Sequence, residues 1–240
     1  MATKARTNWR LSEIGWRVGA VLLVIAVGGL GCNPIATIGF LAYPFCPNND
    51  EPAFPLTLKG KESKVVFLCA HEDNVATNDA FRDADQALCR QLTNLLSLQY
   101  KENKDKVNIV PVSKVYAYLR EHKDWITQPK QDIGKHFDAD FVVYLELGPM
   151  TMYEPKSNKA LYRGNVEIRI AVIDMRQADG EGTKPDQFYS CTYPATCPED
   201  AGSMTPENFR ARFLDRIAKD LVPYFATHPA ERKMDKMDSN

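Results

Sequence analysis

The stretch that decides the fold runs from Gly134 to Met175 and reads GKHFDADFVVYLELGPMTMYEPKSNKALYRGNVEIRIAVIDM. Residues 141–145 are an unbroken apolar run, which predicts a central strand covered on both faces. Apolar and polar residues alternate between 165 and 172, the pattern of a strand with one dry face and one wetter face. Turn-forming residues are frequent in 147–163, so we expect a long hairpin loop between the two strands.

Further elements follow on both sides of this stretch. Short apolar runs at 64–70, 107–110 and 188–193 predict three more strands. Apolar residues at three- and four-residue steps predict helices, with Asn78 or Asp79, Ser113 and Thr205 as expected caps and a further helical turn at 133–137. The expected order is β-α-β-α-α-β-β-β-α. This order is typical of an α/β fold in which helices pack on one mixed β-sheet.

Size and composition are those of a globular protein. The chain has 240 residues, 44% of them hydrophobic and 25% charged. The net charge of −1 gives no electrostatic case for a nucleic-acid partner, and six cysteines are too few for a disulfide framework. We expect a proline-rich tether at 32–60, a single α/β domain at 61–228 and a disordered tail at 229–240.

Residues 1–31 have the organisation of a secretory signal peptide. A basic segment precedes an uncharged apolar segment at 18–31, and its cations are Lys4, Arg6, Arg10 and Arg17. The alternative is an uncleaved membrane anchor, because the apolar character resumes at 35–45 and a span needs only about 20 residues. In both cases the basic end should stay cytoplasmic and the rest of the chain should cross the membrane.

The pair Gly31-Cys32 resembles the lipobox of bacterial lipoproteins, in which the cysteine becomes the diacylated amino terminus. By that resemblance Cys32 is the lipidation site, and it would carry a fatty acid such as palmitate. Gly29 stands where that motif usually has an aliphatic residue, and Leu30 follows one place late. The expected membrane contact is therefore lipid, either through an acyl anchor at Cys32 or through the apolar amino-terminal segment. The expected location is the periplasmic side of a bacterial cell envelope.

A second resemblance depends on Gly134, Ala139, Asp140 and the later Asp174. This pattern is similar to the amino-terminal domain of the Tol system's β-propeller protein. It is also similar to periplasmic domains of the curli secretion lipoprotein and of lipoproteins that activate penicillin-binding proteins. Residues 101–174 resemble a planctomycete family of uncharacterised predicted lipoproteins. The likeness covers 64–174 and implies a fold, without catalytic residues, a defined ligand or a secretion pore.

His71, Glu72 and Asp73 follow the first predicted strand and group an imidazole with two carboxylates. A hydrolase or metal site can begin with such a group. The other histidines, at 122, 136 and 228, do not have ligand spacing, so a polar loop at a strand end is the simpler interpretation. The sequence also has no glycine-rich phosphate loop and no nucleophile elbow. We therefore expect no enzyme activity, no metal and no cofactor.

The cysteines leave two questions open. Cys191 and Cys197 are close in sequence, and export permits oxidation, so a disulfide and two free thiols are both compatible with the pattern. Cys69 falls on an apolar strand, and Cys89 falls on the apolar face of a helix. They either pair with each other or are two buried thiols.

The sequence favours a membrane-anchored, exported accessory or structural component of the envelope, acting through contact with an unidentified protein. One alternative is an envelope hydrolase or metal-dependent enzyme around His71. Another is a small-ligand binding module that uses the loop at 148–162. Met150, Met152 and Tyr153 in this loop either pack on the domain or contact a partner.

Overall fold

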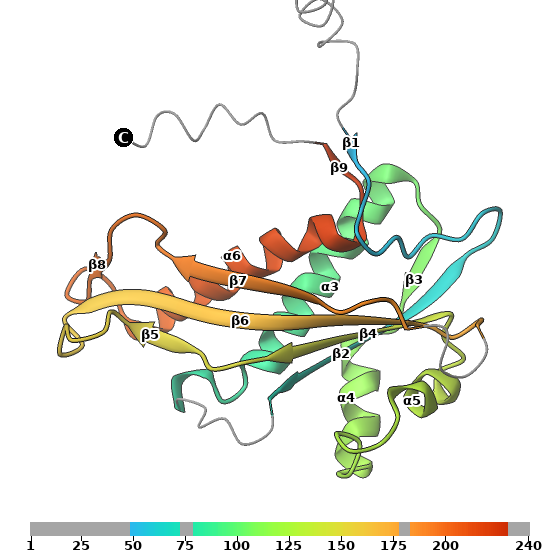
Figure 1. Ribbon diagram of the computed structural model, residues 1–240, viewed down its shortest axis with the longest axis horizontal. Helices are drawn as coiled ribbons and strands as arrows, with labels where there is room; N and C mark the ends of the chain where they lie inside the picture. The colour runs from blue at the N-terminus through green and yellow to red at the C-terminus, as the bar shows by residue number, and fades with distance from the viewer. Residues whose placement is uncertain (1–48, 73–78, 178–182, 230–240) are drawn as a thin grey trace, which may run out of the picture. The chain divides into compact units, whose positions relative to one another are not determined.

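The structure is a computed structural model that describes residues 49–72, 79–177 and 183–229 (Figure 1). Its strands are β1 (Asn49–Asp50), β2 (Ser63–His71), β3 (Val107–Ile109), β4 (Phe141–Leu147), β5 (Thr151–Tyr153), β6 (Leu161–Asp174), β7 (Gln187–Tyr193), β8 (Glu199–Asp200) and β9 (His228–Pro229). Its helices are the 3-10 helix η2 (Asp79–Phe81) and α3 (Ala84–Asn103), α4 (Val112–Glu121), α5 (Lys130–His136) and α6 (Pro206–Phe225). The predicted order is confirmed, and β1, β5, β8 and β9 are short additions to it.

The main sheet has seven strands and is mixed. Its order is β3-β2-β4-β6-β5, with β7 and β8 paired to β6 as well. β2 is parallel to β3 and β4, whereas β6 is antiparallel to β4, β5, β7 and β8. The alternating stretch is the longest strand, β6, with 14 residues. The predicted late antiparallel run is therefore β4, β6 and β7.

Helices cover the two faces of the sheet unequally (Figure 1). α3 and α6 pack on one face, where their buried residues meet Phe67, Leu145 and Ile170. α4 and α5 pack on the other face, where their residues meet Leu68, Val142 and other side chains of β2 and β4. Successive residues of β4 enter opposite cores, so this strand is covered on both faces as its apolar run predicts.

Two of the expected helix starts are wrong, and one is confirmed. Asp79 opens η2, and α3 begins later, at Ala84. Ser113 lies inside α4, because the carbonyl of Pro111 accepts hydrogen bonds from the N–H groups that follow and closes the first turn there. Thr205 does cap α6, since its side chain accepts a hydrogen bond from the N–H of Asn208 at 3.3 Å.

Part of the expected tether at 32–60 packs with the domain. Phe54 and Leu56, in the expected tether, are buried in the core. The N–H of Phe54 donates to the carbonyl of Tyr224 at 2.7 Å, and the Ser63 hydroxyl donates to the carbonyl of Leu56 at 2.6 Å. Proline spacing showed an extended segment, but it did not show that apolar residues between the prolines find a core.

The expected signal peptide or anchor, Cys32 and the tail from residue 230 lie outside the described residues. Within 49–72, 79–177 and 183–229, no helix is long and apolar enough to span a bilayer.

The pattern of Gly134, Ala139 and Asp140 joins α5 to the sheet. The N–H of Ala139 donates to the carbonyl of Gly134 at 3.0 Å, which ends the helix. The carboxylate of Asp140 then accepts from the N–H of Lys64 at 2.9 Å, and so aligns β4 with β2. A Cβ on Gly134 would lie 2.7 Å from a methyl carbon of Val142, so only glycine lets α5 approach this closely. The role of the pattern is structural.

Candidate functional site

His71 ends β2, beside the end of the parallel strand β4. Its Nε2 atom is buried and has no hydrogen-bond partner among the described residues. Glu72 is exposed, and its N–H donates to the carbonyl of Leu147 at 2.8 Å. Asp73 lies outside the described residues. The carboxyl ends of β2 and β4 thus hold one half-buried imidazole, with its Nε2 atom buried, and one exposed carboxylate.

Asp85, in the first turn of α3, interacts electrostatically with His71. Burial raises the pKa of the Asp85 carboxyl, while the charge of His71 and nearby backbone N–H groups oppose this rise. Asp85 was not among the candidates predicted from the sequence, although it is an acidic residue at the start of the helix that follows the His71-Glu72-Asp73 group. An imidazole that interacts electrostatically with a carboxylate has one feature of a general base.

A metal centre does not form around these side chains in the part of the chain that the structure describes. Within it, no group of three or more histidine, cysteine, aspartate and glutamate residues is placed to hold a metal ion. His122 and His136 lie elsewhere, stacked on the ring of Tyr118 with centroid separations of 4.0 and 4.1 Å.

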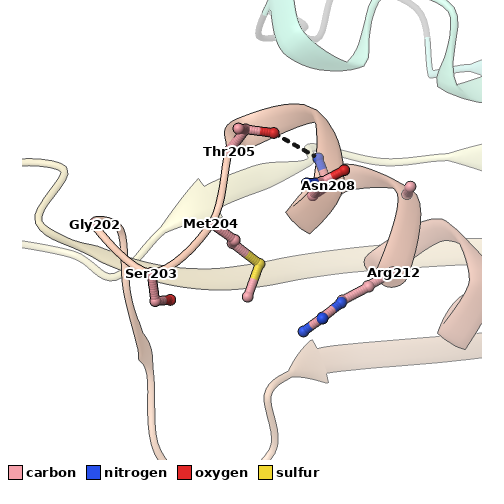
Figure 2. A pocket seen from close by; sticks show the side chains of 7 residues that line it. Gly202, Ser203, Met204, Thr205, Asn208 and Arg212 are labelled. Atoms are coloured by element: carbon pink, nitrogen blue, oxygen red, sulfur yellow. Dashed lines mark hydrogen bonds between the residues drawn. The ribbon is translucent and has the colours of Figure 1, made fainter.

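A shallow hollow lies at the start of α6 (Figure 2). Its lining includes Gly202, Ser203, Met204, Thr205, Asn208 and Arg212. The guanidinium of Arg212 lies 3.9 Å from the carboxylate of Glu199, and the Thr205 hydroxyl is occupied by the helix cap. The polar groups of this hollow are therefore engaged by the protein itself.

The hairpin loop at 148–162 packs on the domain. Met150 and Met152 are buried in the same core as α3 and α6. The ring of Tyr153 stacks on Tyr162 with a centroid separation of 5.2 Å. The packing interpretation of these three side chains therefore holds, and neither methionine is free to line a ligand site.

Cys69, Cys89, Cys191 and Cys197 carry free thiols in the structure. Cys69 and Cys89 are buried, as two core thiols would be, and burial raises the pKa of Cys69. Cys191 is buried and Cys197 is exposed. The disulfide between these last two stays a prediction, and it would need the loop after β7 to bring Cys197 to Cys191.

The most distinctive surface is the outer face of β6 and β7, opposite α3 and α6. α4 and α5 pack against β2 and β4, so this half of the sheet keeps its polar side chains at the surface. We name it the bare face and define it by Asn165, Glu167, Arg169, Phe188, Ser190 and Thr192. All six residues are exposed or half-buried.

The bare face is polar except at one position. Arg169 forms ion pairs with Glu146 and Asp186, and the Thr192 hydroxyl donates to Asn165 at 2.7 Å. Phe188 stands among these side chains and is 73% exposed, more than any other large apolar side chain of the described residues. The alternation in β6 predicted a wetter face, but the sequence analysis did not single out Phe188.

Comparisons with known proteins give only distant likenesses. No protein-family model matches the chain, and no curated protein matches it either. Lipoprotein GNA1162 from Neisseria meningitidis is similar in structure, with 13% identity over 65% of this chain and 99% of that one and a TM-score of 0.40. PelC from Paraburkholderia phytofirmans, solved as a dodecamer, has 12% identity over 74% and 94% and a TM-score of 0.38. The LpoB C-terminal domain from Salmonella enterica has 13% identity over 55% and 86% and a TM-score of 0.35.

These likenesses are a coarse resemblance of fold, and one of the three is a bacterial lipoprotein by its description. Nothing about function follows from scores this low. Membership of the planctomycete family stays a prediction from the sequence.

Proposed function

We propose that this chain is a membrane-anchored, exported protein of the bacterial cell envelope that works by binding another protein through the bare face. The observation that carries the proposal is Phe188, which is 73% exposed and lies opposite Arg169 at one end of the bare face. An exposed aromatic side chain with a polar surround has the composition of a protein-binding hot spot. Arg169 and its two carboxylates would form the polar rim.

The proposed address depends on the amino-terminal sequence. The basic residues before 18, the apolar segment at 18–31 and the lipobox-like Gly31-Cys32 support export and a lipid anchor. Acylation at Cys32 and an uncleaved apolar helix are two ways to hold the same domain at the membrane. The resemblance to envelope lipoproteins in the Gly134–Asp174 region supports an accessory role over a catalytic one.

The experiment is site-specific photo-crosslinking in intact cells. A photoreactive phenylalanine analogue at position 188 should form adducts with a protein partner. Leu98 on α3 provides a matched control, because it is 60% exposed but lies outside the bare face. Adducts at 188 and none at 98 support the proposal. The absence of adducts at 188, or the same adducts at both positions, contradicts it.

One observation favours the hydrolase alternative, namely the buried and unpartnered Nε2 of His71 beside Asp85. If this pair acts as a base, His71→Asn should abolish an activity of the envelope fraction while the fold, followed by circular dichroism, is preserved. Phe188→Ala should leave that activity unchanged, which separates the two candidate functions.

A further inference from the structure

β7 forms one edge of the main sheet, and its hydrogen-bonding direction follows from its neighbours. The carbonyl of Glu167 accepts from Gly148, on the β4 side of β6, at 2.8 Å. The carbonyl of Val172 accepts from Lys184, on the β7 side, at 3.1 Å. Residues of a strand alternate in the side toward which their backbone groups point. Odd-numbered residues of β6 therefore bond toward β4, and even-numbered residues bond toward β7.

The register extends this rule to β7. Ile168 is opposite Tyr189, and Val166 is opposite Cys191, so the odd-numbered residues of β7 bond to β6. The N–H and C=O groups of the even-numbered residues, Phe188, Ser190 and Thr192, then point away from the sheet. No described residue forms a hydrogen bond with these groups.

This edge has none of the usual protection against pairing. Exposed edge strands are commonly blunted by lysine, proline, bulges or very short length. β7 reads QFYSCTY, seven residues without charge or proline, and its register with β6 is unbroken. The opposite edge, β3, has only three residues and follows Lys106. Of these two described edges, β7 is the one that offers a long template for another strand.

The β7 edge is complementary to itself. Ser190 is the middle residue of the strand 187–193, so a two-fold axis there places Ser190 opposite Ser190 of a second copy. The same axis places Phe188 opposite Thr192 of that copy. These are the residues whose backbone groups point outward, so every pair along the new ladder can exchange N–H and C=O hydrogen bonds.

The charges beneath the strand fit the same axis. The Tyr189 hydroxyl donates to Asp220 at 2.9 Å, and Asp220 also forms an ion pair with Arg216 at 2.9 Å. The rings of Tyr189 and Tyr224 have a centroid separation of 6.4 Å, and those of Tyr193 and Phe209 have one of 5.9 Å. α6 thus runs antiparallel to β7 at this point, with position 218 below Ser190. A two-fold axis through Ser190 brings Arg216 of one copy toward Asp220 of the other. Arg216 and Asp220 of each copy already pair with each other, so the two ion pairs would lie antiparallel, with each cation facing the carboxylate of the other copy. This arrangement favours a second copy over an unrelated strand.

We propose that two copies of this chain associate by antiparallel pairing of β7 with β7 about a two-fold axis through Ser190. The inference rests on the proposed function in one respect, because pairing would join the two bare faces into one continuous surface. The partner in this contact is the chain itself, and the envelope protein would bind the joined face.

The test removes the outward N–H group of Ser190, and a control variant accounts for the loss of the hydroxyl. Ser190→Pro deletes the N–H that would bond the second copy, and proline is tolerated where an edge strand faces solvent. Ser190→Ala is the matched control, because it removes the hydroxyl but keeps the N–H. Sedimentation of the full chain in nonionic detergent should show dimers for the wild type and Ser190→Ala. Ser190→Pro should raise the dissociation constant about tenfold or more, with an unchanged circular dichroism spectrum.

A charge exchange tests the axis independently. Arg216→Asp and Asp220→Arg should each weaken the dimer, and an equimolar mixture of the two single variants should restore it as a heterodimer, although the intrachain ion pair is broken in both chains. A wild-type chain that sediments as a monomer overturns the inference, as does a dimer that Ser190→Pro leaves intact. A monomer that still forms adducts with another protein through position 188 overturns self-association alone and leaves the proposed function standing. A dimer in which position 188 forms no adducts with another protein overturns the proposed function and leaves self-association standing.

Discussion

Gly164→Ala would test the packing between β6 and α6 directly. A Cβ on Gly164 would lie 2.8 Å from Cδ1 of Phe213 and 2.9 Å from two other ring carbons. The Phe213 ring is fully buried and has Phe81, Tyr193 and Phe209 as aromatic neighbours. The ring therefore has no free space to move into, and the added methyl group must displace it against other aromatic side chains.

The size of the effect follows from two opposing terms. Inserting a methyl group into a close-packed core costs about 1–3 kcal/mol. Alanine in place of glycine recovers about 0.5–1 kcal/mol of chain entropy in a strand. With the midpoints of these two ranges, the net loss in the free energy of unfolding should be about 1 kcal/mol.

The assay is guanidinium denaturation of the full chain in nonionic detergent, followed by circular dichroism. Gly202→Ala is the matched control, because Gly202 is exposed and a Cβ there would lie 3.3 Å from the nearest atom. Its effect should stay within about 0.5 kcal/mol. Phe213→Leu should relieve the clash, so the double variant should lose at least about 0.5 kcal/mol less than the sum of the single variants. An unchanged Gly164→Ala variant, or additive losses, would refute this account of the packing.

Three further variants test other parts of the molecule. Ile170→Asp places a charge at a fully buried position and should unfold the domain, at a cost of several kcal/mol, which a circular dichroism spectrum would show. Asp85→Asn should stabilise the domain at pH 7, because burial raises the pKa of Asp85 and the stability of the folded wild type falls as pH rises through that pKa. The gain should vanish below about pH 4, where the wild-type carboxyl is protonated in both states, and thermal melts across pH check this. Cys32→Ser should release the chain from the membrane fraction if the anchor is an acyl chain, and should leave an uncleaved apolar anchor unaffected.

The fold could be predicted where the local sequence pattern indicates which side chains are buried. The alternation in β6 predicts one covered face, and the apolar run in β4 predicts two covered faces. The structure confirms both predictions. The helix starts were less predictable, because Asp79 has the chemistry of a cap but the tertiary fold makes it the start of η2. Phe54 and Leu56 show the same limit, since their burial depends on where α6 ends.

The candidate surface was less predictable than the fold. The sequence predicted a strand at 188–193, but a local pattern does not say whether a strand lies in the middle of a sheet or at its edge. That difference decides whether Phe188 is covered or 73% exposed. The sequence could not show that Asp85 interacts with His71 either, because this interaction depends on how α3 packs against β2.

β1 and β9 pair with each other, so residues 49 and 229 leave the domain as direct neighbours (Figure 1). A few added residues would be enough to splice these two points together, and new ends could then be opened between Asn158 and Lys159 in the exposed hairpin turn. Such a circularly permuted domain would have the same side chains in a different order along the chain. It would also move any reporter protein attached at the new ends away from residues 49 and 229.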